Sequence, residues 1–76
     1  MAGWRPLKKR DLIGKVRTLG FAGPFNGTRH QFMTLGGHRQ TIPTNSEYSI
    51  PQVRMLVRQI ESILGRSISP DEWDSS

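Results

Sequence analysis

The segment FNGTRHQFM, residues 25–33, contains the side chains that metal-independent cleavage of RNA would use. In that reaction the RNA 2′-hydroxyl attacks the adjacent phosphorus, so a base must take its proton and an acid must protonate the leaving 5′-oxygen. Histidine suits both steps because its ordinary pKa lies near working pH, whereas lysine or arginine would need a large pKa shift. His30 is therefore the candidate catalytic residue.

The residues around His30 suit the binding of phosphate. Gly27 would let a phosphate approach the backbone closely, and the amides of Gly27 and Thr28 are candidate donors to it. Arg29 and Arg39 are candidate phosphate clamps. A basic cluster also opens the first predicted helix, where cations oppose the helix dipole at a cost of about a few tenths of a kcal/mol each. That cost favours contact with RNA phosphates or an acidic partner, and a solvated helix end is the alternative; the cluster consists of Lys8, Lys9 and Arg10.

Each aromatic or imidazole side chain also has a purely structural interpretation. His30 would then be a polar strand residue on an ordinary sheet, since neither a fold nor one histidine implies catalysis. His38 follows Gly36-Gly37 at a predicted hairpin tip and is interpreted as a solvated turn residue. Phe32 shares the side of His30 if strand alternation is regular, and would then stack a base on an open face. Core packing is the commoner role of phenylalanine.

The composition limits the classes of function. The 76 residues include eleven Lys and Arg against six Asp and Glu, and the resulting net charge of +5 attracts polyanions such as nucleic acid. A need for solubility explains this charge equally well. Cysteine is absent, which excludes disulfides, thiolate nucleophiles and Cys-containing zinc sites. We therefore expect no metal centre and no cofactor. The lack of a leader-like or membrane-spanning apolar run predicts a cytoplasmic protein.

Two helices are predicted from the spacing of apolar residues. The second is the stronger, with one apolar face over residues 53–64 and an end at Gly65. Ser49 and Gln52 have the spacing of a capping box, and Pro51 lies in the first turn, where its missing N–H costs little. The first helix ends before Gly20, and its apolar residues at i, i+1, i+4 and i+7 are Leu12, Ile13, Val16 and Leu19.

Turn signals between the two helices predict three strands. Gly23-Pro24 breaks or bulges the first of them, which indicates an edge position. Asn26-Gly27 is a strong hairpin signal. HQFMTL is then the second strand, GGH the second turn and RQTIP the third strand. This order predicts an α+β fold, α-β-β-β-α, in which two helices cover one face of a three-stranded antiparallel sheet and the other face is open.

The length suits a single domain, residues 1–76, with the core within about residues 7–65. The tail, residues 66–76, contains another cap signal at Ser69 and Glu72, which predicts a single helical turn. Trp73 in that turn is expected to pack back onto the body of the protein.

Three sequence motifs resemble the HicA family, the toxin half of bacterial and archaeal toxin–antitoxin pairs. RDLIGKVRTLGF resembles the family's first helix, GTRHQF places His30 where the family has its histidine, and TIP resembles the end of the third strand. The resemblance covers roughly residues 7–65. Thr28 stands where serine is usual, and the segment at 44–46 lacks the histidine that many relatives have there.

The resemblance implies a fold like the double-stranded-RNA-binding domain and an activity as an mRNA endoribonuclease, an mRNA interferase. It also implies neutralisation by a HicB-like antitoxin protein. Two other hypotheses stay open from the residues themselves: a non-catalytic RNA-binding module that uses the same basic face, and a protein-interaction domain whose basic surface docks an acidic partner.

Overall fold

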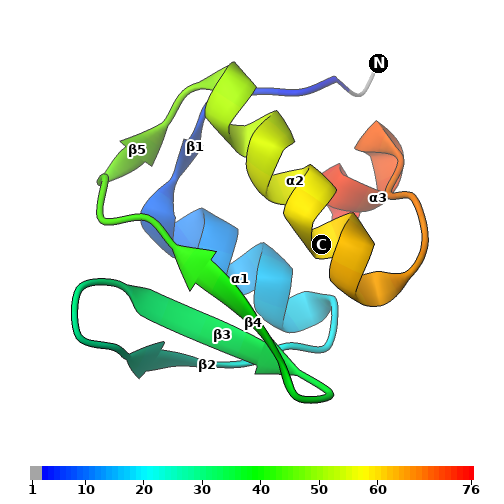
Figure 1. The fold of residues 1–76 in the computed structure, drawn as a ribbon. Coiled ribbons are helices and arrows are strands. Elements are labelled where there is room, and N and C mark those ends of the chain that lie inside the picture. The colour runs from blue at the N-terminus through cyan, green and yellow to red at the C-terminus, as the bar shows by residue number, and fades with distance from the viewer. Residues whose placement is uncertain (1–2) are drawn as a thin grey trace.

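A computed structural model describes residues 3–76 of the chain (Figure 1). Its helices and strands follow the predicted order, with a short strand added before the first helix and another before the second. In chain order, the elements are β1 (Leu7–Lys8), α1 (Lys9–Thr18), β2 (Ala22–Asn26), β3 (Gln31–Leu35), β4 (His38–Ile42), β5 (Glu47–Tyr48), α2 (Ile50–Leu64) and α3 (Pro70–Ser75).

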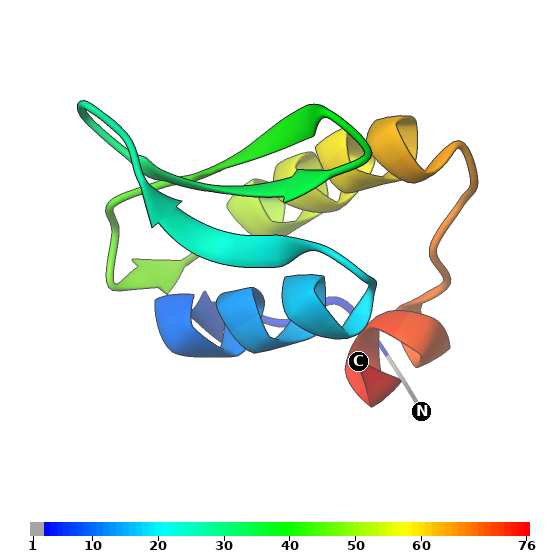
Figure 2. The same ribbon diagram turned by 90° about the horizontal axis from the view of Figure 1, so that it is seen from below.

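The central sheet has the order β2-β3-β4, and both pairs are antiparallel. Met33, Gln40 and Ile42 on its inner face are buried together with apolar residues of α1 and α2. Figure 2 shows α1 running along the sheet, and Gln40 donates a hydrogen bond of 2.8 Å to Gln59 of α2. The prediction of a three-stranded antiparallel sheet with two helices on one face is therefore confirmed.

β2, the first strand of the central sheet, is bulged, as predicted. The pairing of β2 with β3 shifts register between Ala22 and Phe25, so Gly23 and Pro24 lie within the irregular part. Gly23 has a positive φ of 116°, which favours glycine. Since β2 pairs with β3 alone, it is an edge strand, where proline is tolerated.

Both predicted caps of the later helices are present. The Ser49 side chain accepts a hydrogen bond from the Gln52 N–H at the start of α2, and Gly65 ends this helix in the left-handed conformation. At α3, the Ser69 hydroxyl accepts from the Glu72 N–H over 3.1 Å. Each cap satisfies a backbone group that the helix itself leaves unpaired.

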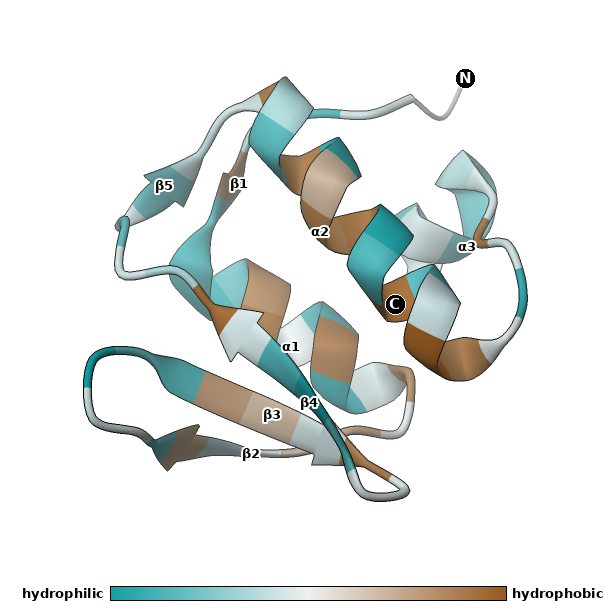
Figure 3. Cartoon of the chain, in the orientation of Figure 1, coloured by the Kyte–Doolittle hydropathy of each residue, from teal (hydrophilic) through white to brown (hydrophobic). Residues whose placement is uncertain are grey.

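The core lies between the sheet and the helices and extends to the tail. Figure 3 shows hydrophobic and hydrophilic segments alternating along α1 and α2, as expected of helices with one buried side. Trp73 is buried, as predicted, and its ring lies 6.5 Å from that of Trp4. The buried apolar residues are Leu12, Val16, Phe21, Met33, Ile42, Tyr48, Val53, Leu56, Val57, Ile60, Ile68 and Trp73.

The sequence pattern did not predict the two-stranded ribbon of β1 and β5. In it Leu7 pairs with Tyr48, and Lys8 pairs with Glu47. The ribbon joins the chain before α1 to the chain before α2, and Figure 1 shows the two strands side by side. Within residues 3–76, no helix combines the length and apolar character needed to cross a membrane.

Candidate nucleic-acid interface

His30 lies in the loop between β2 and β3, at residues 27–30, and not at the start of a strand. Asn26 pairs with Gln31, so β3 begins one residue later than predicted. A two-residue Asn-Gly turn of the usual hairpin type needs positive φ at both central residues. Neither Asn26 nor Gly27 has a positive φ. The hairpin therefore closes through a longer loop, and His30 is exposed within it.

Gly27 closes this loop from inside. Its N–H donates to the His30 carbonyl with an N···O distance of 3.1 Å. A Cβ atom on Gly27 would lie 2.5 Å from that carbonyl oxygen and 3.4 Å from Cδ1 of Phe32. The Gly27 amide, a predicted phosphate donor, thus has a partner within the loop, and its contact with a phosphate stays a prediction. Thr28 and Arg29 are exposed beside His30.

The outer face of the sheet carries a second group of side chains, which we call the aromatic face: Phe25, Phe32 and Arg39. The pairing Phe25↔Phe32 places the two rings on one face of neighbouring strands, with centroids 5.7 Å apart. The Arg39 guanidinium lies over the Phe32 ring at 4.2 Å from its centroid, a cation–π contact. Phe32 thus lies on the open face, and not in the core. Phe25 keeps 44% of its surface exposed.

The His30 loop and the aromatic face adjoin one another. Phe25 is separated from the loop by Asn26 alone, and the Phe32 ring lies next to Gly27, with Cδ1 at 3.4 Å from the position of a Gly27 Cβ. Arg39 is exposed on β4 and stacked on Phe32, so its guanidinium faces the solvent across the same surface. The structure therefore brings Gly27, Thr28, Arg29 and His30 together in the loop at one end of the sheet. Arg39 starts near the opposite end, where it pairs with Thr34, and its guanidinium reaches back along the outer face as far as Phe32.

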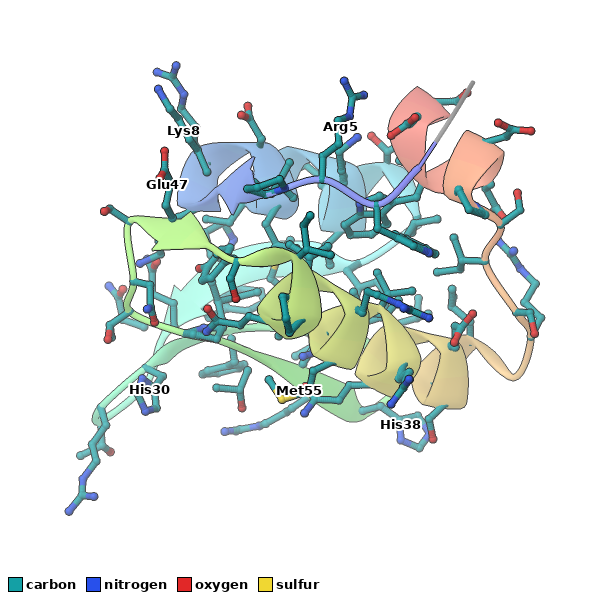
Figure 4. All side chains as sticks on the ribbon, turned by 90° about the horizontal axis from the view of Figure 1, so that it is seen from above. Arg5, Lys8, His30, His38, Glu47 and Met55 are labelled. Carbon is teal, nitrogen blue, oxygen red and sulfur yellow. The ribbon has the colours of Figure 1, made fainter. Side chains whose placement is uncertain are left out.

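His38 lies at the other end of the sheet. It is the first residue of β4, and it follows a two-glycine turn in which Gly36 and Gly37 both have positive φ. In Figure 4 the two imidazoles lie on opposite sides of the view, His30 on the left and His38 on the right. At about 3.3 Å per strand residue, the length of β3 alone separates them by roughly 13 Å. His38 and His30 therefore do not serve one phosphate together.

The basic cluster of Lys8, Lys9 and Arg10 does not join the His30 surface. Lys8 precedes α1 without a side-chain cap, and the Lys9 N–H donates to the Ser46 carbonyl over 3.0 Å. Figure 4 shows Lys8 projecting on the α1 side of the molecule, whereas His30 lies on the side away from α1. An RNA strand on the aromatic face would have to pass around the end of the molecule to reach these cations.

Carboxylates are absent from one long continuous segment of the chain. Residues 12–46, which include the whole sheet, contain no Asp and no Glu. Within this segment Lys15, Arg17, Arg29 and Arg39 are the charged residues. This feature is visible in the sequence, but the total charge alone does not reveal it. The six carboxylates are Asp11, Glu47, Glu61, Asp71, Glu72 and Asp74.

The perturbed titratable groups lie away from the His30 loop. Burial raises the pKa of the Tyr48 phenol, whose hydroxyl donates to the Pro43 carbonyl over 2.7 Å. A hydrogen bond of 2.8 Å from Arg66 lowers the pKa of the Glu72 carboxyl and raises the pKa of Arg66 itself. These groups hold the β4–α2 connection and the tail, respectively, so their shifts have structural causes.

A groove of about 560 Å³ lies between α1 and α3, away from His30. Arg5 bridges to Asp74 across it, with an N···O distance of 3.4 Å, and Lys15 donates to the Trp73 carbonyl over 2.8 Å. Both of these cations therefore already have partners in the groove, whereas His30, Arg29 and Arg39 are exposed at the sheet. Within residues 3–76, no three His, Asp or Glu side chains are grouped so as to hold a metal ion.

Comparison with known proteins adds no relative: no family model, no curated protein and no solved structure matches the chain. The functional argument therefore depends on the residues and on their arrangement in the fold.

Proposed function

We propose that the protein is an mRNA endoribonuclease of the HicA type, in which His30 acts as general acid and base. The observation that carries the proposal is the position of His30, exposed in a loop that borders a carboxylate-free face with Arg39 and two phenylalanine rings. The sequence motifs around His30 support the same assignment.

The proposed reaction uses the RNA, side chains of this loop, Arg39 of β4 and water. The His30 imidazole takes the proton of a 2′-hydroxyl while the 2′-oxygen forms a bond to the adjacent phosphorus. The bond from phosphorus to the 5′-oxygen breaks, and this oxygen receives a proton from the imidazolium or from water. The products are a 2′,3′-cyclic phosphate and a 5′-hydroxyl. Arg29 and Arg39 are the candidate groups that stabilise charge on the phosphoryl oxygens.

The backbone of the loop helps to position His30 for this reaction. The hydrogen bond from the Gly27 N–H to the His30 carbonyl fixes the end of the loop while the imidazole stays exposed. Because His30 is exposed there, an RNA strand on the same surface would meet its imidazole. The proposal includes mRNA as substrate, the cytoplasm as compartment and a HicB-like antitoxin as the partner that blocks the site.

The test compares two histidine variants, His30→Ala and His38→Ala. We expect His30→Ala to slow the cleavage of single-stranded RNA by about 10²–10⁴, because loss of a general base typically has this effect. His38→Ala is the matched control, since it removes the other imidazole from the far end of the sheet. Cleavage is measured on gels, with mass spectrometry of the 2′,3′-cyclic end, in the presence of EDTA.

If His30→Ala cleaves RNA at the wild-type rate, the catalytic assignment is disproved. Both histidines lie at exposed positions, so neither variant should lose much stability, and thermal unfolding checks this. In cells, the wild type should stop growth and degrade mRNA, whereas His30→Ala should not.

A second candidate function is RNA binding without cleavage. The observation that favours it is the aromatic face, whose contacts among Phe25, Phe32 and Arg39 do not involve the His30 side chain. If purified wild-type protein binds single-stranded RNA but leaves it intact, this function replaces the first.

A further inference from the structure

The aromatic face has the form of a platform for a flat ligand. Phe25, Phe32 and Arg39 come from three adjacent strands, so the pleated sheet holds their spacing. The two rings are tilted by 39° and the guanidinium covers part of the inner ring, Phe32. The outer ring, Phe25, is exposed at the edge of the sheet and is free to stack with a further planar group.

The charge around this platform selects the kind of ligand. No carboxylate occurs in residues 12–46, and the face carries Arg39 with Arg29 on the adjoining loop. A planar group attached to an anionic chain satisfies both the rings and the arginines, and this is the chemistry of a nucleotide. An acidic protein segment would pair with the arginines, but it would leave the exposed Phe25 ring without a specific partner.

The geometry points to a base-binding site on Phe25 and Arg39, which takes one unpaired base of single-stranded RNA. An A-form duplex would not use such a platform, because its bases are stacked on one another and its recognition depends on shape, phosphates and 2′-hydroxyls. The inference that this site holds the RNA to be cut rests on the proposed function, and it makes single-stranded RNA the substrate class. The binding itself does not require His30 to be catalytic.

The binding experiment uses RNA that cannot be cut. A short single strand with every 2′-hydroxyl replaced by 2′-O-methyl lacks the attacking group, so affinity is measured by fluorescence anisotropy whether or not the protein is a nuclease. The same sequence annealed to its complement is the duplex comparison. The variants are Phe25→Ala, Phe25→Trp and Arg39→Lys, with Ile50→Ala as the control.

Ile50 suits this control because it is 40% exposed, close to the 44% of Phe25, and lies at the start of α2 away from the sheet. We expect Phe25→Ala to weaken binding of the single strand roughly 5- to 150-fold, the range of one base stacked on an aromatic ring. Phe25→Trp should bind about as tightly as wild type, because it keeps an aromatic ring at this position. Arg39→Lys should weaken binding as well, because lysine keeps the charge but loses the planar group.

Three outcomes separate the base-binding site from the proposed function. If Phe25→Ala binds the single strand as tightly as wild type does, or if the duplex binds as tightly as the single strand, the base-binding site is wrong. If the methylated strand binds as expected while unmodified RNA stays intact, the base-binding site is confirmed and the proposed nuclease function is disproved. If the wild type binds neither form of RNA and instead binds an acidic protein through Phe25, the site is again disproved. Thermal unfolding of each variant shows whether a loss of affinity reflects a loss of folding.

Discussion

At the scale of single residues, Gly27 connects the folding of the loop with the position of His30. The glycine is needed there because a side chain would collide with the His30 carbonyl, at 2.5 Å from its oxygen. Its φ is not positive, so the requirement comes from close approach and not from backbone conformation. A glycine beside the histidine therefore has a structural explanation that holds whether or not a phosphate binds nearby.

Replacing Gly27 should harm the fold, whereas replacing Gly14 should help it. We expect Gly27→Ala to lower the free energy of unfolding by about 1–3 kcal/mol, the usual cost of overpacking, because the obstacle is backbone. Gly14 lies inside α1, and a methyl group added there would meet no heavy atom within 4 Å outside the neighbouring helix backbone, so Gly14→Ala should raise stability by about 0.5–1 kcal/mol. Urea denaturation measures both. Equal effects of the two changes would contradict the account of the loop.

At the scale of elements, the connection between β4 and α2 is fixed by Tyr48 of β5. Its ring is buried, its backbone pairs with Leu7, and its hydroxyl donates to the Pro43 carbonyl at the end of β4. One side chain thus ties the sheet, the β1–β5 ribbon and the entry to α2 together. The ribbon is too short to be stable on its own, so we infer that this anchor holds it in place.

The contribution of Tyr48 to stability should disappear at alkaline pH. Because burial raises its pKa in the folded protein, the contribution is fully present below the ordinary value of 10.0 and is lost as the pH rises through the folded pKa. At neutral pH, the free energy of unfolding of wild type should exceed that of Tyr48→Phe by about 0.5–1.5 kcal/mol, the net value of a hydrogen bond. The measurement is the difference in unfolding free energy between the two proteins from pH 7 to 11. A difference that grows with pH would show that the phenol is not buried as described.

The helices and their caps were predictable because their signals are local. Ser49, Gly65 and Ser69 act within one turn of the helix that each begins or ends, so sequence spacing was enough. The β1–β5 ribbon was not predictable, because strands of two residues have no periodicity to detect.

The candidate site was predictable only as a set of residue types. The sequence identified His30 and Arg39, but it could not show that Arg39 stacks on Phe32, since this contact depends on the register of β3 with β4. The bulge at Gly23-Pro24 also decides which face Phe25 occupies, because one extra residue reverses strand alternation. The loop position of His30 was missed because Asn26-Gly27 resembles a shorter turn.

At the scale of the whole molecule, charge is divided between the sheet and the tail. The sheet segment has no carboxylate, whereas the tail carries Asp71, Glu72 and Asp74 within α3. Glu72 pairs with Arg66, and Asp74 pairs with Arg5, so two of the three tail carboxylates already have cationic partners. We infer that a polyanion approaches the protein from the sheet side, where the arginines Arg29 and Arg39 are exposed.

The binding of single-stranded RNA should depend on salt through those local arginines and not through net charge alone. For a single strand, the logarithm of affinity falls with the logarithm of salt concentration by about 0.7 per neutralised phosphate. We therefore expect Arg39→Gln to reduce the slope for the 2′-O-methyl strand by about 0.7 if Arg39 contacts one phosphate. Arg54→Gln is the matched control, since it lowers the net charge of +5 by the same one unit but changes an exposed arginine of α2. Anisotropy titrations at several salt concentrations measure the slopes. A flat dependence for wild type would exclude a phosphate-tracking surface, and equal changes in the two variants would assign the effect to total charge.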